Sequence, residues 1–175
     1  MTTAIAKNDG GGAALLEKVV VGGDLGKLSA GERMNYYKSV CESVGLNPLT
    51  RPFDYLVLQG KTTLYARKDA TDQLRSIKQV SVQITGRERV EDVFVVTARA
   101  TTGDGRTDES TGAVTIGNLK GDALANALMK AETKAKRRVT LSICGLGWLD
   151  ETELDTIAGA STIPADVDTG EVDEA

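Results

Sequence analysis

Residues 117–147 read GNLKGDALANALMKAETKAKRRVTLSICGLG, and this stretch decides the fold. Its spacing predicts a helix from about Asp122, as the N-cap residue, to Ser142, with Gly145 ending it. Apolar residues recur at helical spacing along one side of this helix, so that side can pack against the rest of a domain. They are Leu124, Ala127, Leu128, Ala131, Ala135 and Val139.

A basic stripe follows a second side of the same helix. Lys130, Lys134 and Arg137 recur at helical spacing, and Arg138 lies on the flank between this stripe and the apolar side. Cations at fixed spacing suit a polyanion such as a nucleic-acid backbone. The same pattern is equally typical of a solvated helix face, and the spacing does not separate the two interpretations.

The charge of the chain is segregated along its length. Residues 150–175 hold nine acids and no lysine or arginine. Removing these nine from the 25 acids leaves 16 acids against 21 basic residues in 1–149, a net charge of +5. The acidic tail has few large apolar residues and is expected to be disordered beyond about Ala158. It competes with nucleic acid for the basic face, recruits a partner, or keeps the protein soluble.

Length and composition favour one domain at 13–149, between a flexible N-terminus at 1–12 and the acidic tail at 150–175. The 41% of hydrophobic residues can form a real core, and no apolar run is long enough to span a membrane. The N-terminus lacks the apolar segment of a secretory signal. Cys41 and Cys144 are far apart in apolar surroundings, which favours buried reduced thiols in a cytoplasmic protein.

Periodicity and turn signals predict the order α-β-β-α-β-β-β-α, an α+β domain with an antiparallel β-sheet and helices packed on one face. A short helix is expected at Ala13–Val21, and a second helix follows a capping box at Ser29–Glu32. A third helix is expected at Ala66–Ile77. The inward residues are expected to be Met34, Tyr37, Cys41 and Val44 in the second helix, and Ala70, Leu74 and Ile77 in the third. Strands are expected at Phe53–Leu58, Lys61–Tyr65, Val80–Thr85, Val93–Thr101 and Arg106–Ile116, with a turn at Asp104-Gly105.

The sequence lacks the residues that several kinds of catalytic and metal-binding site require. There is no histidine, two distant cysteines cannot form a zinc site, and no glycine-rich loop ends in Gly-Lys-Ser/Thr. ATP hydrolysis is therefore not expected, and neither is a cofactor. A Mg²⁺-dependent nuclease remains an alternative through carboxylates. Its candidates are Asp69, Asp72, Asp104, Asp108 and Glu109.

Three pieces of the sequence, in this order, resemble the single-strand annealing proteins of phage recombination systems (RecT, Erf and Sak types) and their ring-forming relative, the annealase Rad fifty-two. The first is the hairpin at 55–65 with the helix at 66–77. The second is the long hairpin VFVVTARATTGDGRTDESTGAVTI at 93–116, and the third is the helix KAETKAKRRVTLSICG at 130–145.

The resemblance implies a β-β-β-α core like that of the Rad fifty-two annealases, assembled into homo-oligomeric rings or helical filaments. It implies ATP-independent binding of single-stranded DNA and annealing of complementary strands in recombination and repair, in a bacterial host cytoplasm and beside an exonuclease partner. The protein would then not be an enzyme. Three alternatives are kept: a single-strand protector without annealing activity, the nuclease, and a structural phage component that ignores DNA.

The resemblance also assigns candidate DNA-binding residues. Arg137 and Arg138 fall at a paired basic dipeptide that lines the DNA-binding groove of the family, and Lys134 and Lys130 extend this track. Leu141 occupies a position where the resemblance implies a further basic residue. A structural ion pair of Arg138 with Glu109 is the alternative. A second cluster forms the other wall of the groove, binds duplex, or is scattered surface charge: Arg51, Lys61, Arg67 and Lys68. Tyr65 stacks on a base or belongs to the core.

Overall fold

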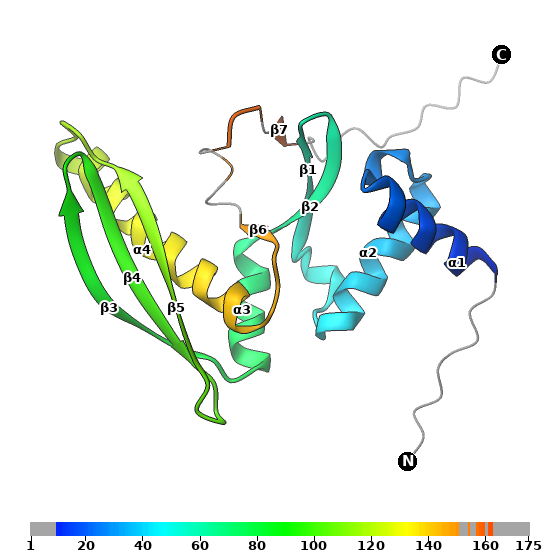
Figure 1. The fold of residues 1–175 in the computed structure, drawn as a ribbon, viewed down its shortest axis with the longest axis horizontal. Coiled ribbons are helices and arrows are strands. Elements are labelled where there is room, and N and C mark those ends of the chain that lie inside the picture. The colour runs from blue at the N-terminus through cyan, green and yellow to red at the C-terminus, as the bar shows by residue number, and fades with distance from the viewer. Residues whose placement is uncertain (1–9, 151–153, 155–156, 160, 163–175) are drawn as a thin grey trace.

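The computed structural model describes residues 10–150, 154, 157–159 and 161–162 (Figure 1). Most of the expected flexible N-terminus and most of the tail beyond Ala158 therefore lie outside the described residues. The helices are α1 (Gly10–Glu17), α2 (Ala30–Val44), α3 (Lys68–Ile77) and α4 (Gly121–Ile143), with short turns at Lys18–Gly22, Leu25–Lys27 and Pro48–Thr50. The strands are β1 (Phe53–Leu58), β2 (Lys61–Ala66), β3 (Ser81–Val90), β4 (Val93–Thr101), β5 (Thr107–Thr115), β6 (Leu149–Asp150) and β7 (Ser161–Thr162).

The α+β class is confirmed, but the strands form two sheets, not one. Strands β3, β4 and β5 make an antiparallel sheet in chain order, and a second sheet has the order β6-β2-β1-β7. Both edges of the β1–β2 hairpin are occupied, because β6 pairs with β2 and β7 pairs with β1. None of β3, β4 and β5 pairs with this hairpin, so the expected antiparallel sheet is divided into two.

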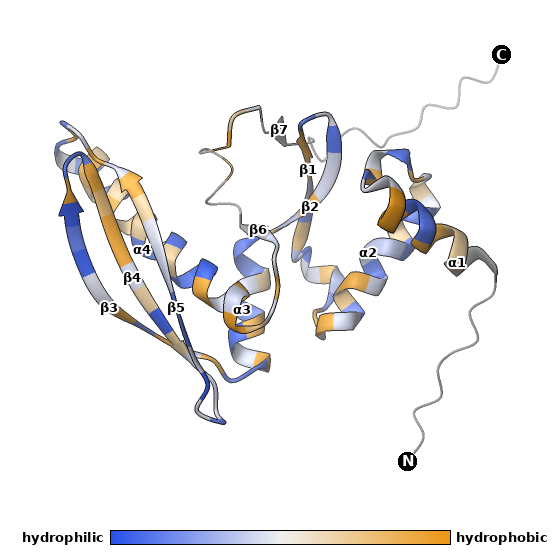
Figure 2. Ribbon diagram, in the orientation of Figure 1, coloured by the Kyte–Doolittle hydropathy of each residue, from blue (hydrophilic) through white to orange (hydrophobic). Residues whose placement is uncertain are grey.

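Helix α4 covers one face of the three-stranded sheet (Figure 1). Side chains alternate across the strands, so every second residue of β4 points toward the helix. Val96, Ala98 and Ala100 on β4 are fully buried there, in one core with Ala131, Ala135 and Val139 of the predicted apolar side of α4. Figure 2 shows β4 as a mainly hydrophobic strand beside β3, whose C-terminal part is hydrophilic.

The backbone of α4 lies unusually close to β5. A Cβ atom added at Gly112 would stand 2.4 Å from the Ala131 carbonyl oxygen and 2.4 Å from the Ala135 nitrogen. Real Cβ atoms do not approach other heavy atoms so closely, so only glycine fits on the strand. Alanines on the facing side of the helix complete the contact, since any larger side chain would hold helix and strand apart.

A second core joins α2, α3 and the β1–β2 hairpin. Phe53 and Leu74 are buried in it, and the Trp148 ring lies 4.6 Å from the Phe53 ring, edge to face. Tyr37 donates its hydroxyl hydrogen to the Phe53 carbonyl oxygen at 2.9 Å. Leu141 of α4 belongs to this core as well, so the C-terminal half of α4 packs against both parts of the protein.

Local signals placed most element ends correctly. The Ser29–Glu32 capping box is present, and Gly145, at φ 71°, follows the end of α4 as expected. The N-cap of α4 is Lys120, whereas Asp122 lies in the first turn, where its charge favours the helix dipole.

Two expected core residues are exposed instead. Met34 is 68% exposed and Ile77 is 47% exposed, because each faces away from the second core. Among the described helices, none is both long and apolar enough to cross a membrane.

The close approach of helix and strand gives a stability prediction. Gly112→Ala is expected to lower the free energy of unfolding by about 2–3 kcal/mol, since the added Cβ meets backbone that cannot move aside cheaply. Urea denaturation followed by circular dichroism measures this. Gly86→Ala is the matched control in a strand, because its Cβ would meet Thr97 at an ordinary 3.6 Å. Equal stability of the Gly112 variant and the parent would contradict the packing argument.

Candidate nucleic-acid interface

The basic stripe of α4 is not the open face that its spacing suggested. Only 6% of Lys134 and 7% of Arg137 are exposed, whereas Lys130 is half-buried and Arg138 is exposed. Helix α4 packs against the sheet on one side and reaches the second core through Leu141. Lys130, Arg137 and Arg138 are each engaged in an interaction within the chain.

The alternative partner suggested for Arg138 is taken by another arginine. Glu109 on β5 pairs with Arg99 on β4, with 2.7 Å between the Arg99 guanidinium and the carboxylate. The two residues are directly opposite each other in the strand register, on the face of the sheet turned away from α4.

The second expected cluster divides in two. Arg51 and Arg67 share the Asp54 carboxylate, at 2.9 and 3.5 Å, beside the start of α3. Lys61 lies at the other end of the hairpin, where it pairs with Leu58 next to the turn. Lys68 is exposed at the first position of α3. The hairpin therefore separates Lys61 from the other three cations by the length of its strands.

Tyr65 is a core residue in this arrangement. Only 7% of its surface is exposed, and it pairs with Leu149 of β6 in the strand register. Its packing is that of a core side chain, which was one of the two roles considered for it beside stacking on a base.

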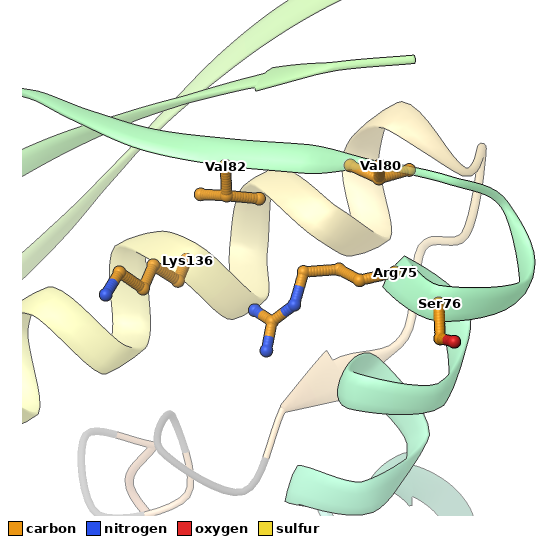
Figure 3. Close-up of a pocket in the computed structure, with 5 residues that line it drawn as sticks. All are labelled: Arg75, Ser76, Val80, Val82 and Lys136. Atoms are coloured by element: carbon orange, nitrogen blue, oxygen red, sulfur yellow. The ribbon is translucent and has the colours of Figure 1, made fainter. Parts of the chain in front are cut away.

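A hollow between α3, β3 and α4 brings together cations that the sequence pattern did not select. Its volume is about 390 Å³, and it is lined by Arg75 and Ser76 of α3, Val80 and Val82 at the start of β3, and Lys136 of α4. Figure 3 shows the Arg75 side chain reaching from α3 toward α4, on the side where Val82 and Lys136 lie. We call this hollow the α3–α4 pocket.

Partly buried ion pairs hold the two lining cations of the α3–α4 pocket. Arg75 pairs with Asp72 one turn earlier on α3. Lys136 pairs with Glu132 at 2.7 Å, and Arg87 of β3 reaches the same carboxylate at 3.0 Å. Hydrogen bonds from Lys136 and then from Arg87 lower the pKa of the Glu132 carboxyl below its ordinary value. Three cations thus face two carboxylates, which leaves an excess of positive charge.

Two features explain why this pocket was missed in the sequence. Lys136 lies in the same basic run as Arg137 and Arg138, but about 200° around the helix from Arg138, since successive residues turn by about 100°. Arg87 faces α4 only because the register of β3 shifts between Ile84 and Gly86. The number of basic residues at 130–138 could have drawn attention to Lys136. The register shift of β3, in contrast, has no visible signal in the sequence.

Four of the five carboxylates considered for a nuclease are engaged in interactions within the chain. Asp108 accepts a hydrogen bond from Ser142, Asp104 accepts one from Thr102, and Asp72 and Glu109 pair with arginines as described. In the described part of the chain, no three acidic or cysteine residues gather closely enough to hold a metal ion.

Comparison of the sequence with models of protein families and with curated proteins gives no match.

The different burial of the paired arginines gives a second prediction. Arg137→Ala is expected to lower the free energy of unfolding by about 2 kcal/mol or more, because it removes a long buried side chain. Arg138→Ala is expected to change it by less than about 1 kcal/mol, because that side chain is exposed. Urea titrations of the two single variants measure the difference. Equal reductions in stability would mean that the two arginines do not differ in burial.

Proposed function

We propose that this protein binds single-stranded DNA without sequence preference and anneals complementary strands without ATP, as the phage annealases it resembles do. The observation that carries the proposal is the α3–α4 pocket, where Arg75 and Lys136 from two helices converge beside Arg87. The two lining cations come from different helices, and cations spread around one open hollow suit the repeated phosphates of a polyanion better than a single small ligand.

The resting ion pairs of the pocket do not oppose this role. Exposed ion pairs contribute only about 0.2–1 kcal/mol each, so a phosphate can replace a carboxylate at little cost. The side chains of Arg75 and Lys136 are 27% and 39% exposed, which leaves them accessible to a strand. Release of counterions from the nucleic acid supplies a free energy that grows with every phosphate bound.

The composition of the pocket supports binding of any sequence. Among the described residues that line it are two cations, a serine and two valines, and none of these is aromatic. A lining that neither stacks on bases nor makes bidentate hydrogen bonds to their edges obtains its affinity mainly from phosphate contacts, which carry no sequence information. A strong dependence on salt concentration follows.

The fold supports the annealase proposal in two respects. The order β3-β4-β5-α4 is the β-β-β-α order that the resemblance implies. Strands β3 and β5 are the two edges of their sheet, and unpaired edges can join protomers side by side into a ring or filament. Adjacent copies would then carry their pockets along one continuous track.

Annealing is tested with two complementary, fluorescently labelled oligonucleotides in the absence of ATP. The protein is expected to accelerate pairing equally with Mg²⁺ and with EDTA, because duplex formation is downhill and needs no cofactor. Electron microscopy of the same mixture is expected to show rings or filaments. Binding that slows pairing would identify a single-strand protector, and strand loss abolished by EDTA would identify a nuclease.

The binding surface is tested by neutralising the pocket. Arg75→Gln with Lys136→Gln is expected to weaken binding of oligothymidylate on the order of tenfold at about 0.1 M salt, and to reduce the slope of log K against log salt by about 0.7 for each phosphate that is no longer neutralised. Fluorescence anisotropy across a salt series measures both quantities. Affinity for oligonucleotides of other sequences is expected to fall equally.

Two variants control this experiment. Lys38→Gln removes an exposed cation of α2 that pairs with Glu42, so it changes the net charge away from the pocket. Arg138→Gln tests the opposite flank of α4. Weaker binding by the Arg138 variant but not by the pocket variant would move the interface to that flank, and unchanged binding in both would reject an interface on α4.

A further inference from the structure

A second hollow adjoins the α3–α4 pocket. Its volume is about 470 Å³, and Val80 lines both hollows. The second hollow lies where the α3–β3 connection, the β4–β5 turn and the C-terminal end of α4 meet. The residues important for its chemistry are Lys78, Thr102, Asp104, Arg106, Ile143 and Cys144. We call it the turn pocket.

Two cations of the turn pocket lie at its rim. Arg106 donates a hydrogen bond to the Ile143 carbonyl oxygen at 3.2 Å, which fixes its guanidinium at the end of α4. Lys78 is exposed on the α3–β3 connection. Asp104, the one carboxylate among the described lining residues, is held by its own turn, where it accepts hydrogen bonds from the Thr102 hydroxyl and the Arg106 backbone nitrogen. The rim therefore carries two cations against one acid that is already satisfied.

The spacing of the two hollows suits a continuous polyanion. Lys136 and Ile143 are seven residues apart on the same side of α4, which corresponds to about 10 Å along the helix axis. A nucleic-acid strand carries one phosphate per nucleotide and spans this distance within a few nucleotides. Val80 and Ile143 are apolar residues of the pocket lining, and each exposes only a small part of its surface.

We propose that a single strand held in the α3–α4 pocket continues across Val80 into the turn pocket, where Lys78 and Arg106 bind a further phosphate. This inference rests on the proposed function, because it extends the path of the same single-stranded DNA. The turn pocket thereby sets the direction in which the strand leaves α4, past the β4–β5 turn.

Lys78→Gln in the full chain tests the phosphate contact, since Arg106 also holds the end of α4 and is less suitable for substitution. For a long oligothymidylate, the variant is expected to reduce the slope of log K against log salt by about 0.7 relative to the parent. Lys38→Gln is the control and is expected to keep the parental slope. A parental slope in the Lys78 variant would overturn the proposed path.

Cys144 reports occupancy of the turn pocket directly. Its thiol is half-buried in the pocket lining, whereas Cys41 is fully buried, so alkylation by N-ethylmaleimide distinguishes the two. Saturating oligothymidylate is expected to slow alkylation of Cys144 several-fold in the parent and much less in Lys78→Gln. The labelled residue is identified by mass spectrometry of peptides.

The outcomes separate the two proposals. Binding of the oligonucleotide by the parent without protection of Cys144 would overturn the path through the turn pocket and leave single-strand binding intact. Absence of binding by the parent would overturn both. Protection that depends on Lys78 would support both.

Discussion

The close packing of the α4 backbone on β5 at Gly112 determines the arrangement of the rest of this protein. Because no Cβ fits between strand and helix, α4 can neither rise from the sheet nor rotate on it without opening a gap in the core. Its remaining sides are thereby fixed: Glu132 meets Arg87 of β3, Ser142 meets Asp108 of β5, and Leu141 reaches the second core. Helix α4 thus becomes the element through which both halves of the molecule are joined.

The candidate interface follows from that placement. The alanine side of α4 is packed against the sheet. Lys136 lies on a different side of the helix, and this rotation of α4 places it in the lining of the α3–α4 pocket. Its pairing with Glu132, which Arg87 shares, keeps the two cations near each other in the absence of a ligand. Such weak, partly exposed pairs hold long side chains in place while remaining exchangeable, which is the property required of a surface that binds and releases a polyanion.

Local features of the sequence predicted the α+β class, the β4–β5 turn, the capping box and the apolar side of α4, because each depends on neighbouring residues alone. The division into two sheets was not predictable in this way, because the partner that each strand takes depends on contacts between distant parts of the chain. The burial of Lys134 and Arg137 was not predictable either, because a helical pattern indicates one packed side and does not show whether another side is also covered. The register shift before Gly86 similarly moves Arg87 onto the face of α4 without a local sign.

The two short strands that flank the hairpin have a consequence for the order in which the protein folds. Leu149 pairs with Tyr65, 84 positions earlier, and Thr162 pairs with Leu56 on the opposite edge of the hairpin. Pairings this distant in sequence close late, because the entropy of the intervening loop must be given up before the strands meet. Each strand contributes only two residue pairs, so these edges are also the first to open in local fluctuations. Strands β6 and β7 are therefore expected to pair late in folding and to open early in local fluctuations.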